Sequence, residues 1–293
     1  MAPTTFCLLV VHEHAGFIAA LRTLPVAERP VYVGRCHHWI HQPHLSASAL
    51  TGTDDVMLRW NYLVVTKATA TGSLALHDTL GSTVTTGWSI YAEVSDDVLD
   101  GFKYAQAKRQ SQAEISLPIG WSHTNHSGLD DAVAPRDLEA SLALESTPLG
   151  GNRDGPKLGL KELTRTLGTK HTGPVNMLNL LAYKSGQRQQ YFKYIAAFAA
   201  SVGSRYGGDA MMLGTPVTDW TSRKEEGAEL AKPEAGGSGV WEDVALVYYP
   251  SIWHFAKMLD DPEYADADRN FKQGVLEDNP ILCCTEVDVG YAE

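Results

Sequence analysis

The spacing of apolar positions in the second half of the chain predicts alternating strands and helices. Strand-length apolar runs occur at 175–183, 209–217, 242–250 and 281–289. After the first of these runs, residues 187–208 repeat apolar side chains with helical spacing and end at two glycines. Asp261 followed by Pro262 marks the start of a second helix. The order βαββαβ predicts a four-stranded antiparallel sheet with both helices on one face.

The first half repeats this order with a weaker pattern. Its strand-like runs lie at 5–12, 30–39, 60–68 and 86–94, and its helix-like runs lie at 14–24 and 73–80. Ser95 then begins an extra helix. We infer an α+β chain of two tandem ferredoxin-like modules, 1–126 and 173–293. The linker between them, 127–172, is rich in Gly, Pro, Asp and Ser over most of its length.

Three stretches of the second half resemble a known superfamily. They are NMLNLLAYKSG (176–186), YFKYIAAFAASVGSRYGGDAMMLG (191–214) and WEDVALVYYPSIWHFAKMLDDPEYADADRNF (241–271). These stretches resemble the ferredoxin-like dimeric α/β-barrel superfamily, and in particular its small branch of unknown function. The first half matches only through its βαββαβ order.

This resemblance implies that the two antiparallel sheets pack into one α/β barrel within the chain, around or beside a ligand cavity. The protein would then be a monomer with an internal pseudo-dimer, or a homodimer. Members of the superfamily include polyketide cyclases, decarboxylases, cofactor-free monooxygenases, lactone isomerases and haem enzymes. The fold alone therefore does not select a reaction.

Composition and motifs exclude several classes of function. The formal charge of −11 argues against nucleic acid or an anionic membrane as the main partner. The four cysteines lack CxxC or zinc-finger spacing, and the first apolar run is too short for a signal peptide or membrane span. GxGxxG, GxxxxGK[ST], HExxH and GxSxG are all absent. We expect a cytoplasmic protein that uses no cofactor.

Four of the eleven histidines lie between residues 37 and 44. If this stretch begins as a strand, alternation directs His38 toward the barrel interior and His37 to the opposite face. His41 and His44 would follow in a loop. A metal site needs three or four converging ligands, which this spacing supplies only in a helix that Pro43 opposes. We therefore predict no metal site here, although one remains an alternative, as do histidines without a role. His38 is the candidate acid or base.

Other candidate side chains lie on strands or at their ends. His12 ends the first strand, where it can reach a barrel mouth or simply form a terminal hydrogen bond. Tyr62 reaches the cavity and can donate a proton to an oxyanion if its aliphatic neighbours face the helices. Glu93 is either a desolvated carboxylate with a raised pKa or a rim residue paired with a cation. The expected substrate-binding residues are Tyr32, Trp60, Tyr91, Trp121 and His123.

These features predict a cofactor-free lyase or isomerase that acts by acid/base catalysis. It would cyclise, isomerise, dehydrate or decarboxylate a hydrophobic, polyketide-like or other natural-product substrate in an aromatic-lined cavity. His38 or His12 would move the proton while Tyr62 stabilises the oxyanion. One alternative is an oxidative enzyme that depends on a metal, haem or oxygen. Another is a non-catalytic small-molecule-binding or stress-response protein.

Overall fold

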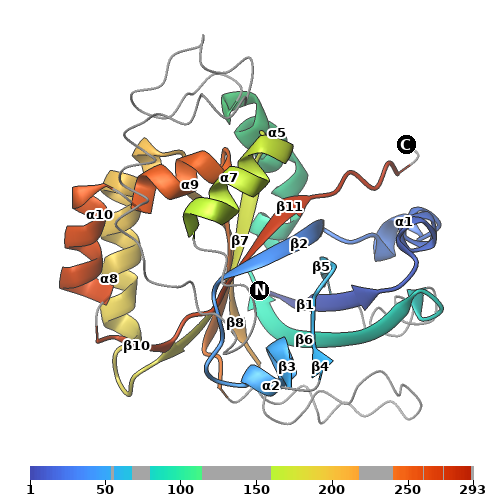
Figure 1. Cartoon of the computed structure of the whole chain (residues 1–293), viewed down its shortest axis with the longest axis horizontal. Helices are drawn as coiled ribbons and strands as arrows, with labels where there is room; N and C mark the ends of the chain where they lie inside the picture. Colours follow the sequence, from blue (N-terminus) through green and yellow to red (C-terminus); the bar gives the residue numbers. More distant parts are fainter. Residues whose placement is uncertain are drawn as a thin grey trace.

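The computed structural model describes residues 1–53, 56–67, 80–113, 160–217, 240–259, 261–272 and 274–291 (Figure 1). Its strands are β1 (Ala2–Val11), β2 (Tyr32–His41), β3 (Gly52–Thr53), β4 (Val56–Met57), β5 (Tyr62–Lys67), β6 (Val84–Val94), β7 (Val175–Tyr183), β8 (Asp209–Pro216), β9 (Asp243–Tyr249), β10 (Leu276–Asp278) and β11 (Ile281–Glu286). Its helices and short helical turns are α1 (His14–Arg22), η1 (Val26–Glu28), α2 (Ala47–Thr51), α4 (Asp96–Asp100), α5 (Phe102–Ala113), α7 (Leu160–Lys170), α8 (Arg188–Phe198), η3 (Ala199–Gly203), α9 (Ile252–Leu259), α10 (Pro262–Ala267) and η5 (Asp268–Lys272). None of the helices within these ranges is long and apolar enough to cross a membrane.

Eight of the described strands close into an antiparallel barrel. Their order is β7-β11-β2-β5-β1-β6-β8-β9, and β9 pairs with β7 to complete the ring. The first half supplies β6-β1-β5-β2 and the second half supplies β11-β7-β9-β8. In each half, therefore, the fourth strand lies beside the first, the first beside the third, and the third beside the second. This is the order of a ferredoxin-like βαββαβ module, so the predicted fold of two tandem modules in one intrachain barrel is confirmed.

Two seams join the modules. At the β2–β11 seam, the pairing runs from Gly34 opposite Glu286 to His41 opposite Ile281. At the β6–β8 seam, Ala92 lies opposite Pro216. Because each module pairs its two edge strands with those of the other, the barrel leaves neither sheet with an open edge along these seams.

The barrel interior is filled by side chains from both modules. Members of this cluster are at most 9% exposed and come from every strand of the ring: Phe6, Leu8, Tyr32, Cys36, Leu63, Val65, Trp88, Ile90, Ala92, Leu178, Leu180, Met211, Met212, Val244, Leu246, Leu282 and Cys284 are among them. The aliphatic and aromatic members pack as a hydrophobic core. Aromatic side chains are present in the interior, as expected. They fill it, however, where the sequence predicted that they would line a cavity.

Both ends of the barrel are covered by described residues. At one end, Phe102 of α5 packs into the interior cluster and Gln106 Nε2 donates a hydrogen bond to Glu286 Oε2 at 2.5 Å. At the other end, Trp60 Nε1 donates to the carbonyl of Leu50 in α2 at 2.7 Å, and Trp241 is buried beside them. Figure 1 shows α5 and α2 at opposite ends of the molecule.

Helices cover the outer surface of each sheet. In the first module, Phe17 and Leu21 of α1 pack on the outward side chains of β1 and β5. In the second module, α7, α8, α9 and α10 lie together on the other side of the molecule (Figure 1). Leu163 and Leu167 of α7 belong to that outer core, so the last part of the predicted linker is a helix packed on the second module. The predicted helix at 73–80 lies outside the described residues except for its last residue.

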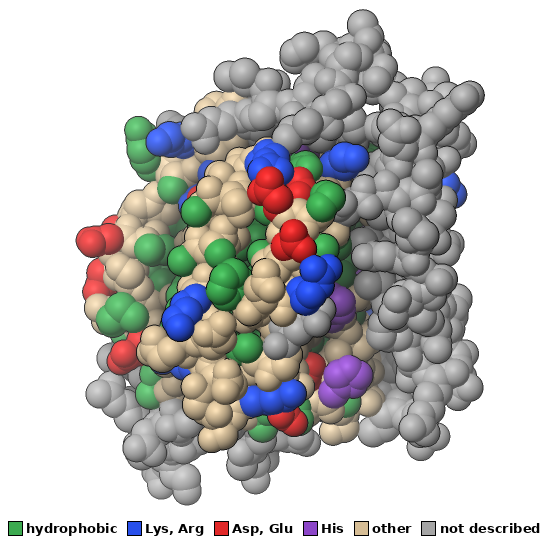
Figure 2. Space-filling view, turned by 90° about the vertical axis from the view of Figure 1, so that its left-hand side faces the viewer, with side chains coloured by type: hydrophobic (Ala, Val, Ile, Leu, Met, Phe, Trp, Pro, Cys, Tyr) green, Lys and Arg blue, Asp and Glu red, His purple; other side chains and the backbone are tan. Residues whose placement is uncertain are grey.

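The face that carries α8 and α10 bears charged side chains of both signs. Lys and Arg side chains alternate with Asp and Glu side chains across it, with apolar and histidine side chains between them (Figure 2). Mixed signs of this kind give no extended field that would attract a polyanion.

Candidate functional site

A bulge in β2 places His38 on the outside of the barrel. On β11 the adjacent residues Cys284 and Cys283 lie opposite Cys36 and His38 on β2. His37, between Cys36 and His38, therefore has no partner of its own and is the extra residue of the bulge. Such a bulge reverses the alternation of side chains beyond it. His38 therefore shares the outer face with Cys283, while Trp39 turns into the interior cluster. The predicted inward orientation of His38 is wrong.

The two histidines at the bulge are both hindered from taking up a proton. His37 Nε2 lies 2.8 Å from Thr285 Oγ1, and loss of solvent and the nearby His171 and Arg35 lower its pKa to about 4. His38 is half-buried, and its pKa is lowered by burial and by Arg59. Neither imidazole faces the barrel interior.

Tyr62 lies beneath α1 rather than in the cavity. Its ring stacks on Phe17 with centroids 4.5 Å apart and meets His14 edge-on at 5.7 Å. Leu63 and Val65 are the β5 residues in the interior cluster. The sequence-based orientation is reversed because both faces of β5 are apolar, so alternation alone does not tell which face is inside.

Glu93 and Tyr91 also lie on the outer face of the barrel. On β6, Trp88, Ile90 and Ala92 turn inward, which leaves the odd-numbered positions outside. Glu93 is exposed, so the predicted desolvated carboxylate is wrong. Lys67, a cation that could pair with it at the rim, forms an ion pair with Asp100 instead.

The remaining predicted residues fall into three groups. Tyr32 and Trp60 do face the barrel interior, as expected, and both are buried there. His12 is exposed at the end of β1, with its Nδ1 3.3 Å from Thr85 Oγ1. Trp121 and His123 lie outside the described residues. The structure therefore does not gather the predicted set into one site.

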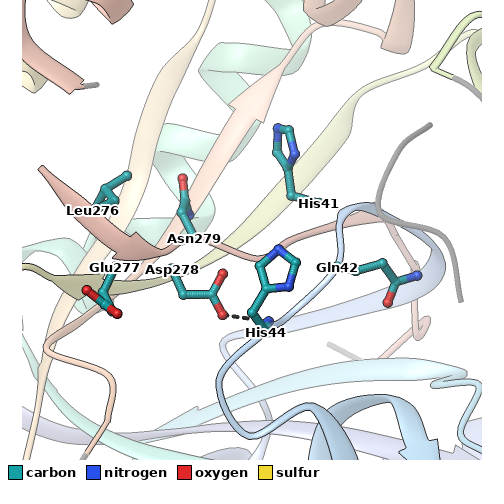
Figure 3. Close-up of a pocket in the computed structure, with 7 residues that line it drawn as sticks. All are labelled: His41, Gln42, His44, Leu276, Glu277, Asp278 and Asn279. Atoms are coloured by element: carbon teal, nitrogen blue, oxygen red, sulfur yellow. Dashed lines mark hydrogen bonds between the residues drawn. The ribbon is translucent and has the colours of Figure 1, made fainter. Parts of the chain in front are cut away.

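A pocket lies where the β2–β11 seam ends. Its volume is about 450 Å³, and we call it the seam pocket. The first module contributes the end of β2 and the loop after it, and the second contributes β10 and the turn before β11 (Figure 3). Its lining residues are His41, Gln42, His44, Leu276, Glu277, Asp278 and Asn279. Clefts between domains are common places for small-molecule sites.

Asp278 fixes the two walls of the seam pocket to each other. Its Oδ2 accepts a hydrogen bond from the backbone N–H group of His44 at 2.7 Å (Figure 3) and a second from that of Leu45 at 2.8 Å. The side chain is only 6% exposed, so these bonds replace its hydration. On the same wall, Asn279 Nδ2 donates to the carbonyl of Leu180 in β7 at 3.1 Å. The two Asp278 bonds therefore cross from module to module, and the Asn279 bond holds the turn to its own module.

His41 is a neutral imidazole on one wall of this pocket. It is the last residue of β2, which ends two residues later than the sequence indicated. His41 is exposed overall, and partial loss of solvent around the ring together with the nearby Lys272 lowers its pKa to about 4, against the opposing effect of Asp268 and Asp278. His44 lies beside it with its ring directed into the same space (Figure 3). A neutral imidazole can accept a proton at one nitrogen while donating from the other.

The seam pocket contains functional groups that the sequence interpretation had not combined. Glu277, Asp278 and Asn279 precede a proline, Pro280, in a turn-forming stretch, which was the available signal. Nothing in the sequence linked this turn to the histidines more than 230 residues earlier. Within the described ranges, no group of three or more His, Cys, Asp or Glu side chains is arranged to hold a metal ion.

Comparison with known proteins adds similarities of fold. No family model matches the chain, and no curated protein matches it. Among solved structures, a protein of unknown function from Rhodopseudomonas palustris is 21% identical over 40% of this chain and 85% of its own, with a TM-score of 0.31. Its methylated form is 24% identical over 40% and 84%, with a TM-score of 0.31. A protein described as a "putative monooxygenase" from Lactobacillus acidophilus NCFM is 9% identical over 98% and 94%, with a TM-score of 0.44. These similarities assign no activity to this chain.

Proposed function

We propose that this chain is a small-molecule enzyme of the acid/base type and that its substrate binds in the seam pocket. The observation that supports this proposal is the position of His41 and His44 beside Asp278, in a pocket built by both modules. The proposed reaction belongs to the lyase or isomerase class, because a base in a pocket can start an elimination or an isomerisation by removing a proton.

The lining groups favour a polar substrate. Imidazole, amide and carboxylate groups surround the pocket, and Leu276 is its one aliphatic member among the lining residues. A substrate with hydroxyl, amine or carbonyl groups can form hydrogen bonds to this wall. The hydrophobic substrate expected from the sequence was assigned to the barrel interior, which side chains fill. The proposed substrate therefore differs from that expectation in both polarity and place.

In the proposed mechanism, His41 accepts the proton. Its lowered pKa keeps the imidazole neutral at pH 7 but also makes it a weaker base than free imidazole, so the expected rate advantage comes from holding the substrate against it. His44 can hold or relay a proton beside it, and Gln42 and Asn279 orient the substrate by hydrogen bonding. Asp278 is a positioning residue, because its carboxylate is already bonded to the backbone of His44 and Leu45.

The elimination of 5-nitrobenzisoxazole tests this proposal, because this reaction reports any accessible base in a pocket that admits the probe. The rate is compared with that of free imidazole at the same concentration. We expect the protein to exceed it, and His41→Gln to remove at least about nine-tenths of the excess, in keeping with the size of general-base effects. His38→Gln is the matched control, since His38 lies on the same strand outside the pocket. Circular dichroism verifies that each variant is folded.

The pH dependence separates His41 from an ordinary histidine. With a pKa of about 4, His41 keeps its basic form between pH 6 and 8, so the rate is flat there and falls only below about pH 5. A base with an unperturbed pKa near 6.5 gives a rate that still rises between pH 6 and 7. A rate no higher than that of free imidazole, or one lost in His38→Gln but not in His41→Gln, would refute the proposal.

A further inference from the structure

Two of the four cysteines meet across the β2–β11 seam. Cys36 on β2 lies directly opposite Cys284 on β11. Their sulfur atoms are 3.7 Å apart, and both thiols are free. Both side chains point into the barrel interior, where Cys36 is 9% exposed and Cys284 is fully buried. The two residues are 248 positions apart in the sequence, so this contact exists only because the barrel closes.

The geometry of this pair fits a disulfide. Directly opposite residues on antiparallel strands have Cα atoms roughly 4.5–5.5 Å apart. Disulfides span Cα separations of about 4.4–6.8 Å. The backbone is therefore already placed, and side-chain rotation alone must bring the sulfurs to bonding distance.

The other two cysteines do not compete for this bond. Cys7 lies on the outer face under α1, where its sulfur accepts a hydrogen bond from Ser89 at 3.3 Å. Cys283 directly precedes Cys284 on β11 and faces the helices of the second module. Adjacent residues of a strand point to opposite faces, so Cys283 cannot reach Cys36. Only one of the possible pairings has its sulfurs in contact.

We propose that Cys36 and Cys284 are an oxidation site that forms a disulfide between the two modules. The oxidant is a two-electron oxidant of the peroxide class. The Cys36 thiolate attacks one oxygen of hydrogen peroxide, which gives a sulfenic acid and releases hydroxide that takes up the thiol proton as water. The Cys284 sulfur then attacks the sulfenic sulfur and expels a second water. The two thiols lose two hydrogens in total, and the peroxide is reduced to two waters.

The disulfide would fasten the seam that ends at the seam pocket. It closes a loop of 248 residues, and cross-links over long loops restrict the unfolded chain most strongly. Burial raises the pKa of the Cys284 thiol, so the reaction is slow at neutral pH and faster as pH rises. This inference does not depend on the proposed acid/base function, because it uses neither His41 nor a substrate.

The test treats the full chain, freed of reductant, with hydrogen peroxide under native conditions. We expect the intact mass of the denatured protein to fall by two hydrogens, and peptide mapping to link Cys36 to Cys284. The oxidised protein should melt at least about 5 °C higher than the same sample after dithiothreitol. Cys36→Ser removes the mass loss, whereas Cys7→Ser, the matched control, retains it.

Three results would overturn the inference. They are a mass gain by added oxygen with no cross-link, a link that involves Cys7 or Cys283, and a Cys36–Cys284 link that leaves the melting temperature unchanged. All three are read on the wild-type chain. The conclusion therefore does not depend on whether the serine variants fold.

Discussion

Removing one hydroxyl from the barrel interior should destabilise the protein measurably. Asn176 Nδ2 on β7 donates a hydrogen bond to the Tyr32 hydroxyl on β2 at 2.9 Å. Tyr32 is 1% exposed and Asn176 is fully buried, so water cannot replace this bond. The bond links the first module to the second across the interior. Tyr32→Phe keeps the ring and deletes only the hydrogen-bonding atom.

The expected magnitude follows from the groups left behind. Asn176 Oδ1 already lacks a hydrogen-bond partner, and Tyr32→Phe would leave its Nδ2 unpaired as well. An unpaired buried donor costs about 1–3 kcal/mol of unfolding free energy. We therefore expect Tyr32→Phe to lower the unfolding free energy by about 1–3 kcal/mol. Asn176→Ala should lower the unfolding free energy less in the Tyr32→Phe variant than in the wild-type protein, because the variant has already lost the bond.

Urea unfolding measured by circular dichroism checks this expectation. Tyr62→Phe is the matched control, because Tyr62 lies under α1 with ring contacts to Phe17 and His14. We expect Tyr62→Phe to change stability by less than about 0.5 kcal/mol. The reasoning is wrong if Tyr32→Phe is as stable as the wild type, or if the two Asn176→Ala effects are equal.

Three further changes probe the seams and the pocket. Gly214→Val should destabilise the β6–β8 seam by about 1–3 kcal/mol in urea unfolding, because a Cβ there meets Ala92 Cβ at 2.8 Å; a neutral effect would contradict the packed seam. Asp278→Ala should cost about 1–3 kcal/mol by removing both backbone bonds, and should broaden the amide signal of His44 in NMR spectra. The free energy of unfolding should fall as pH drops from about 6.5 toward 4. In this range His37 and His41 bind protons in the unfolded chain, whereas their lowered pKa keeps them neutral in the folded protein. In His37→Gln this decline should be shallower, and an unchanged slope would be evidence against the assignment.

The architecture could be predicted from the sequence because the composition of each segment indicates locally whether it is a strand or a helix. The succession of strands in each half, the helix start at Asp261 and the inward face of Tyr32 are local features, and the described residues contain all three. Asp261 accepts its capping bond from the backbone of Glu263 at 2.8 Å, as the residue pattern indicated.

The candidate site was predicted less well, for two physical reasons. Where both faces of a strand are apolar, as on β5, composition does not say which face is inside, and Tyr62 was assigned to the wrong one. Where a strand is bulged, as at His37, one extra residue reverses the positions that follow it, which moved His38 outward. Neither feature leaves a signal in a single sequence.

The seam pocket could not be predicted from the sequence for a third reason. Its walls come from segments that are distant in the sequence, and the bond from His44 to Asp278 spans 234 residues. Local patterns predict an element and its faces, but not which distant turn will lie against it. The closure of the barrel decides that contact.

The claim that the seam pocket is the functional site is tested most directly by observing its imidazoles. In protein labelled with ¹⁵N-histidine, NMR spectra are recorded from pH 8 to 4, with and without 6-nitrobenzotriazole, an unreactive analogue of the benzisoxazole probe. We predict that His41 remains neutral down to about pH 4 and that the analogue shifts the His41 and His44 signals but not that of His12. A His41 that titrates near its ordinary pKa, with analogue-induced shifts at His12 or His38 instead, would contradict the account.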